Sequence, residues 1–343
     1  RNGFMGAIGD YVWRVNEQRA SELSNRVIGS ITNHYDITDE LFLRARLSTD
    51  FTYRKNENET SSTRPLAFGP SGGFSMSNEI FSILYGDLLL TYRKKLTDEV
   101  TLSAMAGYTA NKESYSSISR GTNGGLSTEN LFDIVSFLNL PNNGSRRTSQ
   151  VIDAALGTVN FDYKGFWFLE GTIRRDRTST MNPDNNAFVY PSANTSFILS
   201  DAIEMPGFIN LAKFRGSWGI VGNYPDVYRA NIAYNQNTLG VQQTGGSPVL
   251  YTNISSSFGN DLIRPEQKHE FELGFESRFL QGRLNLNFSY YNAQIRDQIL
   301  PLTLPSTSGA GSVLANIGTL RNKGIEISLD GTDYKSTNLE LTA

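Results

Sequence analysis

The sequence of 343 residues contains no cysteine and only two histidines, His34 and His269. Without cysteine the chain cannot form a disulfide framework, a thiolate metal site or a cysteine nucleophile. Charge of one sign is not in excess either, since the formal net charge is −3. This balance excludes the basic footprint of a nucleic-acid-binding protein. No run of about 18 apolar residues occurs, which excludes a transmembrane helix.

The most regular pattern is a pair of alternating segments within residues 258–297. Successive side chains of a strand point to opposite faces, so each segment predicts a strand with one apolar and one polar face. The apolar residues of the two segments are Phe271, Leu273, Phe275 and Phe279, then Leu284, Leu286, Phe288 and Tyr290. Gly282 favours a tight turn at 280–282. Each arm has about ten residues or more, roughly what a tilted strand needs to cross a bilayer.

The same alternation recurs along the chain. It is clearest in residues 41–54, where the apolar spacing does not fit an amphipathic helix. Shorter examples are predicted near 26–35, 81–93, 100–108, 155–163, 167–173, 188–200, 213–221 and 325–329. Polar insertions are predicted at 55–79, 111–150, 222–260 and 300–321, a turn at 330–333, and a strand end or loop at 11–15.

Long insertions alternate with short turns, and this order predicts the fold. It favours an all-β fold, a transmembrane antiparallel up-and-down β-barrel with long extracellular loops and short periplasmic turns. A soluble all-β protein is the alternative. The pattern stops in mid-strand at the C-terminal end, no signal peptide is visible, and an open sheet edge cannot face hydrocarbon. We therefore expect residues 1–343 to be the middle strands of one larger barrel domain.

Charged residues occupy the polar sides of the two clearest segments. Charge facing lipid is costly, whereas charge facing a wet lumen is not. We therefore expect these residues to face the lumen or contact an internal plug, a solvated face with structural ion pairs being the alternative. They are Arg44, Arg46, Asp50, Arg54, Glu270, Glu272, Glu276 and Arg278.

No motif in the sequence predicts catalysis. The two histidines lack a nucleophile elbow or other spaced catalytic motif, so surface or lumen positions are expected for both. Oxygen-rich clusters around Asp184 and at Asp330 and Asp333 could bind calcium, but ordinary turn formation explains them better. We therefore predict no enzymatic activity, metal or cofactor. The aromatic residues predicted for interfacial belts, with sugar stacking as the alternative, are Trp13, Trp167, Trp218, Tyr290 and Tyr291.

Several stretches occur in a distinctive order in the second half of the chain. They are RRDRTST at 174–180, FVYPS at 188–192, FRGSWGIVGN at 214–223, the hairpin at 260–297, LPLTLP at 300–305, NIG at 316–318 and NKGIEI at 322–327. Over residues 150–330 this order resembles the barrel of SusC/RagA-like TonB-dependent outer-membrane transporters of Bacteroidota. Residues 1–150 share with that family only the general pattern of strands and loops and none of these motifs.

The resemblance implies a barrel of about 22 strands filled by an N-terminal plug, which we expect to lie outside this chain. It implies the bacterial outer membrane, with its lipid and lipopolysaccharide, as the surroundings. The implied partners are a SusD-like surface lipoprotein and TonB, which would be reached through a segment outside this chain. The implied function is energised import of oligosaccharides or peptides. A structural SusC-like subunit of a larger outer-membrane assembly, without import of its own, is the alternative.

Overall fold

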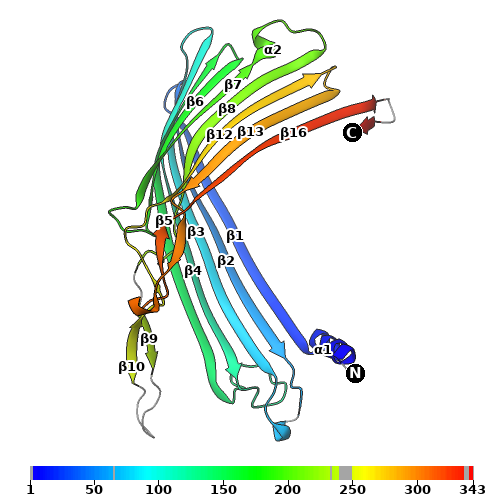
Figure 1. Cartoon of the computed structure of the whole chain (residues 1–343), viewed down its shortest axis with the longest axis vertical. Coiled ribbons are helices and arrows are strands. Elements are labelled where there is room, and N and C mark those ends of the chain that lie inside the picture. The colour runs from blue at the N-terminus through cyan, green and yellow to red at the C-terminus, as the bar shows by residue number, and fades with distance from the viewer. Residues whose placement is uncertain (1–2, 65, 232–233, 239–248, 336–339, 343) are drawn as a thin grey trace. The chain divides into compact units, whose positions relative to one another are not determined.

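The computed structural model describes residues 3–64, 66–231, 234–238, 249–335 and 340–342. Its main feature is a 12-stranded sheet in the order β1-β2-β3-β4-β5-β6-β7-β8-β12-β13-β16-β17 (Figure 1). From β5 onwards each neighbouring pair is antiparallel. Such a meander is the topology of an up-and-down barrel wall, so the predicted all-β fold is confirmed.

The strands of this sheet are long. Their bounds are β1 Gln18–Asp36, β2 Leu41–Thr60, β3 Gly73–Lys95, β4 Val100–Asn123, β5 Asn139–Tyr163, β6 Trp167–Thr178, β7 Ala187–Ile198, β8 Ile209–Asn223, β12 Glu266–Phe279, β13 Leu284–Arg296, β16 Thr319–Lys335 and β17 Glu340–Thr342. β3, β4 and β5 have 23, 24 and 25 residues. A tilted strand needs only about 9–11 residues to cross a bilayer, so these three strands are longer than a membrane requires.

The chain divides into two compact units. Unit 1 comprises residues 1–31, 46–86 and 111–150, and unit 2 comprises residues 32–45, 87–110 and 151–343. Unit 1 therefore contains one part of each strand from β1 to β5, helix α1 (Gly3–Glu17) and the loops 61–72 and 124–138. Unit 2 contains the other part of these strands and all later elements. Within the described ranges, no helix has the length and apolarity that a membrane crossing requires.

The strand register of unit 2 separates apolar from polar side chains. One row across the sheet contains Phe161, Leu169, Thr195, Gly216, Leu273, Tyr290 and Ile325. The adjacent row, on the opposite face, contains Asn160, Glu170, Asn194, Ser217, Glu272, Tyr291 and Gly324. Because side chains alternate with a period of two, each face keeps its character from strand to strand. We call these two surfaces the apolar face and the polar face.

Aromatic side chains line up on the apolar face. One row consists of Tyr163, Trp167, Phe197, Phe214, Phe275 and Phe288. The Phe214 and Phe275 ring centroids lie 4.9 Å apart, and those of Trp167 and Phe197 lie 6.5 Å apart. Trp218 and Tyr290 share this face, as an aromatic belt requires. Tyr291 instead pairs with Glu272 on the polar face, so the belt prediction is wrong for this residue. Trp13 lies in α1, not in a strand, and its belt position stays a prediction.

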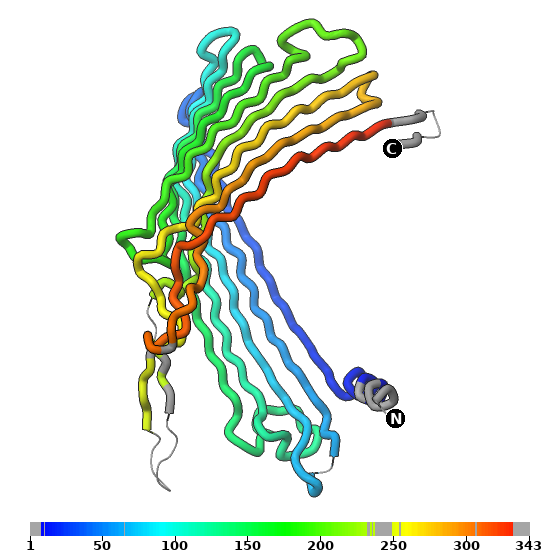
Figure 2. Tube along the Cα trace, viewed as in Figure 1, coloured from blue at the N-terminus to red at the C-terminus, as the bar shows by residue number. Residues whose placement is uncertain are grey.

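The hairpin of β12 and β13 forms where the sequence predicts it (Figure 2). Leu280, Gln281 and Gly282 have φ of 53°, 62° and 81°, so three successive residues adopt the left-handed region and only the last is glycine. The neighbouring connection supports this turn. The backbone N–H of Gln281 donates to Asn210 Oδ1 at 2.6 Å, and that of Leu280 donates to the Phe208 carbonyl at 2.8 Å. Short helix α2 (Leu199–Ala202) begins that connection.

The predicted insertions contain more structure than their composition suggests. Strand continues into 55–79 and 111–150, which leaves only 61–72, with the 3₁₀ turn η1 (Leu66–Phe68), and 124–138 as loops. The other two insertions contain β9 (Tyr234–Thr238), β10 (Leu250–Ile254), β11 (Ser257–Phe258), β14 (Ile299–Thr303), η2 (Ser306–Ser308) and β15 (Ser312–Asn316). β9 pairs with β10, while β14, β15 and β11 form a separate three-stranded sheet.

β2 shows why the insertions were predicted as loops. Its apolar side includes exposed Leu47 and Phe51, and the same side continues past Tyr53 with three charged residues, Lys55, Glu57 and Glu59. The Lys55 Nζ and Glu57 Oε1 atoms lie 2.7 Å apart. The apolar alternation therefore ends although the strand does not, because a strand with water on both faces needs no apolar side.

Two further predictions are wrong. Residues 11–15 belong to α1, where Ile8, Tyr11, Val12 and Val15 have the spacing of one helical stripe. Residues 330–333 are not a turn but part of β16, in which Asp330 pairs with Asn285 of β13. Asp and Gly favour turns, but here cross-strand pairing decides the conformation.

Candidate functional site

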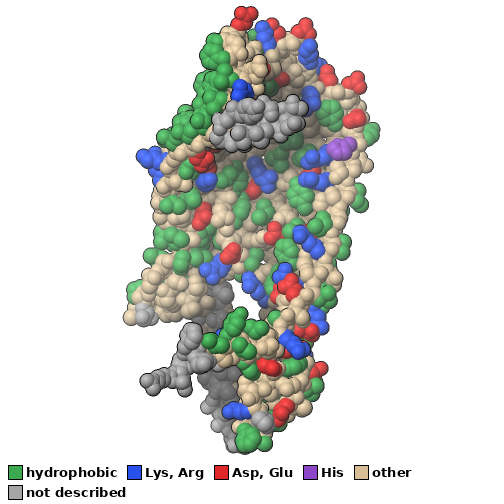
Figure 3. All heavy atoms as spheres, turned by 90° about the vertical axis from the view of Figure 1, so that its right-hand side faces the viewer, with side chains coloured by type: hydrophobic (Ala, Val, Ile, Leu, Met, Phe, Trp, Pro, Cys, Tyr) green, Lys and Arg blue, Asp and Glu red, His purple; other side chains and the backbone are tan. Residues whose placement is uncertain are grey.

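The polar face of unit 2 has charges of both signs. Figure 3 shows acidic and basic side chains interspersed over one face of the molecule. The four charged residues predicted on β12 all have ionic neighbours: Glu270 contacts Lys268 at 2.5 Å, Glu272 contacts Arg215 at 3.8 Å, and Glu276 contacts Lys213 at 3.9 Å and Arg278 at 3.3 Å. These side chains are about a third to a half exposed, so each pair contributes little to stability. The face is therefore a wetted, mixed-charge surface.

Arg215 crosses this face over a glycine. Its NH2 group donates to Ser289 Oγ at 2.8 Å and to Asn287 Oδ1 at 3.2 Å, two strands away on β13. The side chain passes over Gly274 of β12, where an added Cβ would lie 2.2 Å from Arg215 Nε. Gly274 thus leaves the space through which Arg215 connects β8 to β13. The sequence reading missed Arg215, for which a glycine interrupting the alternation of β12 was the available signal.

Replacing Gly274 by valine should displace Arg215 and remove its hydrogen bonds to Ser289 and Asn287. We expect the free energy of unfolding to fall by about 1–3 kcal/mol, as overpacking usually costs. Urea unfolding of the full-length protein in lipid vesicles measures the change. In an Arg215→Ala background most of this loss should disappear, since the clash is gone. Equal losses in both backgrounds would show that Arg215 does not occupy this space.

The charged residues predicted on β2 are also paired on the polar side of their strand. In unit 2, Arg44 NH2 lies 3.2 Å from Asp87 Oδ1, and the Asp87 side chain is fully buried. In unit 1, Asp50 accepts two hydrogen bonds from Arg26, at 2.9 and 2.5 Å. Other contacts include Arg46 over the Tyr85 ring at 5.1 Å, and Arg54 with Glu22 at 3.4 Å and with Glu79 at 4.0 Å. Ion pairs link these strands across the polar side.

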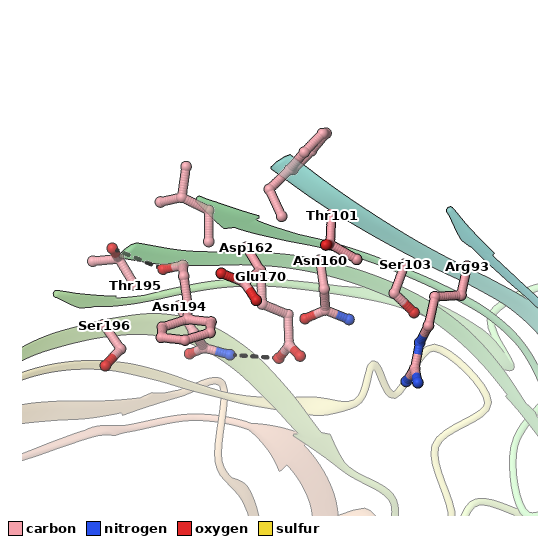
Figure 4. Close-up of a pocket in the computed structure, with 12 residues that line it drawn as sticks. Arg93, Thr101, Ser103, Asn160, Asp162, Glu170, Asn194, Thr195 and Ser196 are labelled. Atoms are coloured by element: carbon pink, nitrogen blue, oxygen red, sulfur yellow. Dashed lines mark hydrogen bonds between the residues drawn. The ribbon is translucent and has the colours of Figure 1, made fainter. Parts of the chain in front are cut away.

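A depression of about 510 Å³ lies against the polar face of unit 2 (Figure 4). Asn160, Glu170, Asn194 and Ser196 project from one side of their strands towards it, and Arg93 projects from β3. Asn194 Nδ2 donates to Glu170 Oε1 at 2.9 Å. The lining combines these carboxylate, guanidinium, amide and hydroxyl groups with the side chains of Phe161, Phe168 and Leu169, so it offers a ligand both hydrogen bonds and apolar contacts.

The long loops of unit 2 form a folded module, which we call loop module 2 (179–186, 224–231, 255–265 and 297–318). Its core contains Met181, Ile263 and Leu314, which are 5%, 1% and 4% exposed, so one residue from each of three loops is buried. Tyr224 packs against this core, and its hydroxyl hydrogen-bonds that of Tyr190. Burial, and secondly the Tyr190 hydrogen bond, raises the pKa of Tyr224 well above its ordinary value.

Side-chain hydrogen bonds join the loops of this module. Asn316 Nδ2 donates to the carbonyls of Arg264 at 2.8 Å and Asp297 at 2.9 Å, while its Oδ1 accepts from Arg264 N–H at 2.8 Å. Glu266 accepts from the backbone N–H of Ile299 at 2.7 Å. The loops are thus fixed to one another and to the start of β12. The sequence analysis includes Asn316 and Glu266 in motifs that carry the family resemblance, but it predicts no role for either side chain.

Unit 1 has a loop module of its own, formed by 61–72 and 124–138. Leu126 is 1% exposed at its centre. The backbone N–H of Ser62 donates to Asn130 Oδ1 at 2.8 Å, and that of Leu66 donates to Glu129 Oε1 at 2.6 Å. Carboxylate and amide side chains of one loop therefore accept hydrogen bonds from backbone N–H groups of the other loop. Irregular segments need such partners because their backbone groups are not paired in a sheet or helix.

The structure also places the residues considered for catalysis or metal binding. His34 lies exposed on β1, and His269 on β12 contacts Gln267 Oε1 at 3.2 Å. The backbone N–H of Asp184 donates to Asn182 Oδ1 at 3.1 Å, which is the turn geometry expected of Asn. Asp330 and Asp333 both lie in β16, and the side chain of Asp333 is outside the part of the chain that the structure describes. Among the described residues no group of three or more His, Cys, Asp and Glu side chains is arranged to hold a metal ion.

An antiparallel meander with one apolar and one polar face defines the class of this protein, a β-barrel of the bacterial outer membrane. Comparison with known families agrees. Residues 3–343 match the family model described as TonB dependent receptor-like, beta-barrel, and the chain belongs to this family. The resemblance to SusC/RagA-like receptors and the outer-membrane location are confirmed.

Individual relatives support this membership. The chain is 26% identical to TonB-dependent receptor P26 of Formosa agariphila over 92% of its own length and 32% of that protein. It is 23% identical to TonB-dependent receptor SusC of Bacteroides thetaiotaomicron over 53% of its length and 19% of that protein. The solved structure of the RagAB peptide transporter matches with a TM-score of 0.82 and 17% identity, covering 96% of this chain and 36% of that one. The chain thus spans about a third of the length of P26 and of the RagAB chain.

Proposed function

We propose that this chain is part of the wall of a SusC-like importer. Its apolar face would lie against lipid and its polar face against a wet lumen that contains the plug. The separation of the two faces across unit 2 is the observation that supports this proposal most directly. Charged residues on the lipid side of a barrel cost about 2–4 kcal/mol at the bilayer midplane, whereas lumen residues are free to be charged. Arg44, Arg46, Asp50, Glu270, Glu272, Glu276 and Arg278 would then line the lumen or contact the plug.

The lengths of the connections between strands indicate how the barrel would be oriented in the membrane. Short turns link β5 to β6 and β12 to β13, whereas the two loop modules connect the opposite strand ends. In bacterial outer-membrane barrels the short turns face the periplasm and the long loops face outside. We therefore place both loop modules outside the cell. There they would present folded surfaces to a SusD-like lipoprotein and to the cargo.

The function we assign is TonB-dependent import of oligosaccharides or peptides. Energy would reach the protein through a TonB-contact segment outside this chain. The depression beside Glu170 and Asn194 would lie along the lumen wall. RagA-like relatives in the RagAB structures belong to a peptide importer, and SusC bears the name of a TonB-dependent receptor. Both cargo classes carry the hydrogen-bonding groups that such a wall offers.

Purification of the full-length protein from native outer membranes in mild detergent tests the proposal. We expect one SusD-like lipoprotein to co-purify in about equal amount, and cargo uptake to stop when the TonB-contact segment is deleted. Deleting 124–138 or 255–265 should reduce lipoprotein capture without preventing barrel insertion. The opposite result would be that several unrelated outer-membrane proteins co-purify in a fixed ratio and that deleting the TonB-contact segment leaves cargo uptake unchanged. That result would contradict import and favour the structural subunit.

A further inference from the structure

The apolar face of unit 2 changes character towards the ends of the strands that lead to the long loops. On β12 the face passes from Leu273 and Phe271 to His269 and Gln267. On β16 it passes from Ile327 and Ile325, which are 68% and 63% exposed, to exposed Lys323 and Arg321. Apolar side chains thus give way to polar and cationic ones on the same surface. In a barrel such a change marks the edge of the lipid-facing band.

Three cations gather at this edge. The register aligns Phe271, Asn292 and Lys323 in one row, His269, Gln294 and Arg321 in the next row on this face, and Gln267, Arg296 and Thr319 in the third. These nine positions contain three cations and no carboxylate. We call Arg296, Arg321 and Lys323 the cationic patch.

Among the described residues, the polar contacts of the cationic patch do not compensate its charge. Arg296 Nε and NH2 donate to Gln294 Oε1 at 3.1 and 2.8 Å, and Arg321 Nε donates to Asn292 Oδ1 at 3.0 Å. Both acceptors are neutral amides, which orient the guanidinium groups without neutralising them. All three cations are exposed. Within the described part of the chain none of the three forms an ion pair.

Another part of the same face shows the contrasting arrangement. At the equivalent edge on β5 and β6, Arg177 Nε donates to Asp153 Oδ1 at 3.0 Å, and Tyr108 donates to Asp153 Oδ2 at 2.7 Å. There an internal carboxylate neutralises the cation. The positive charge of the cationic patch is therefore a local property and not a general feature of this edge.

We propose that Arg296, Arg321 and Lys323 bind the phosphate of an anionic glycolipid in the outer leaflet. The apolar side chains beside them, Phe271 and Ile325 among others, would contact its acyl chains. Guanidinium groups bind phosphate oxygens through paired hydrogen bonds, and these bonds strengthen where water is partly excluded. The choice of an outer-leaflet glycolipid rests on the proposed orientation, with long loops outside. One continuous surface with an apolar and a cationic part matches a lipid better than a soluble anion.

The test uses the full-length protein, freed of lipid in detergent and titrated with phosphorylated lipid A, dephosphorylated lipid A, phosphatidylglycerol or inorganic phosphate. Each cation near an anionic lipid surface strengthens binding about fivefold, so the triple variant R296Q/R321Q/K323Q should bind phosphorylated lipid A about 100-fold more weakly. The matched control D153N/R177Q removes a charge pair from the same face without changing net charge. It should bind phosphorylated lipid A like the parent protein.

Each outcome decides the proposal. Preference for phosphorylated over dephosphorylated lipid A, lost only in the triple variant, supports it. Unchanged binding in the triple variant overturns it, as does equal binding of the two lipid A forms. Equal or tighter binding of phosphatidylglycerol or inorganic phosphate overturns the assigned glycolipid. An epitope inserted at Gly309 and detected on intact cells tests the orientation separately, and none of these readouts depends on uptake, so import can fail without affecting them.

Discussion

Replacing Leu273 by arginine is expected to lower the stability of the membrane-inserted barrel by about 2–4 kcal/mol. Leu273 is 47% exposed in the centre of the apolar face, between Gly216 of β8 and Tyr290 of β13. An arginine there would place a charge against hydrocarbon, where neither water nor a carboxylate of this face compensates it. The free energy of unfolding from vesicles, and the fraction of protein that resists unfolding in SDS without heating, measure the effect.

The matched control is Ser217→Arg. Ser217 pairs with Glu272, one position from Leu273 on the same strand pair but on the polar face. An arginine at 217 would meet water and a carboxylate, so we expect a change of at most about 1 kcal/mol. If both variants lose the same stability, the assignment of the two faces to lipid and lumen is wrong.

Replacing Ile263 by aspartate is expected to unfold loop module 2 while leaving the barrel inserted. Ile263 is 1% exposed and packs with Met181 and Leu314, each from a different loop. Truncating a buried Ile or Leu alone costs about 2–5 kcal/mol, and an unpaired buried carboxylate adds to that cost. Hydrogen exchange at 255–265 and 312–318 should rise sharply, and capture of the lipoprotein should be lost.

Leu262→Asp is the control for this experiment, because the neighbouring Leu262 is 72% exposed. It introduces the same charge one residue away and should leave hydrogen exchange in the module unchanged. If Ile263→Asp unfolds the module and lipoprotein capture persists, loop module 2 is not the docking surface. If exchange does not rise, the three loops do not share this core.

The polar face was predictable from sequence to the extent that it depends on alternation within one strand. Glu270, Glu272 and Glu276 could be assigned to one side of β12 because their neighbours Phe271, Leu273 and Phe275 are apolar. Lys268 and Arg278, the partners of Glu270 and Glu276 on the same strand, follow from the same alternation. The partners from β8 could not be predicted in this way. Arg215 reaches Glu272, and Lys213 reaches Glu276, from about 60 residues earlier in the chain, through a register that no local pattern encodes.

The long loops were the least predictable part. The polar composition of 111–150 indicated a loop, yet most of it is strand, since β4 and β5 continue into it. A strand without an apolar face gives no apolar alternation by which to recognise it. Ile263 and Leu314 also carry little local signal as a core. Each is an isolated apolar residue in a polar segment, and only the meeting of three loops buries them together.

Sequence alone determined the alternating segments of the large sheet, their two faces and the tight turn at 280–282, because these depend on the period-two alternation and on the local preferences of glycine. It also determined the family through ordered short motifs. Tertiary structure decided which side chains form rows across neighbouring strands, the path of Arg215 over Gly274, the core of loop module 2 and the cationic patch. Those features join residues that are distant in the chain, and cross-strand register together with loop packing brings them into contact.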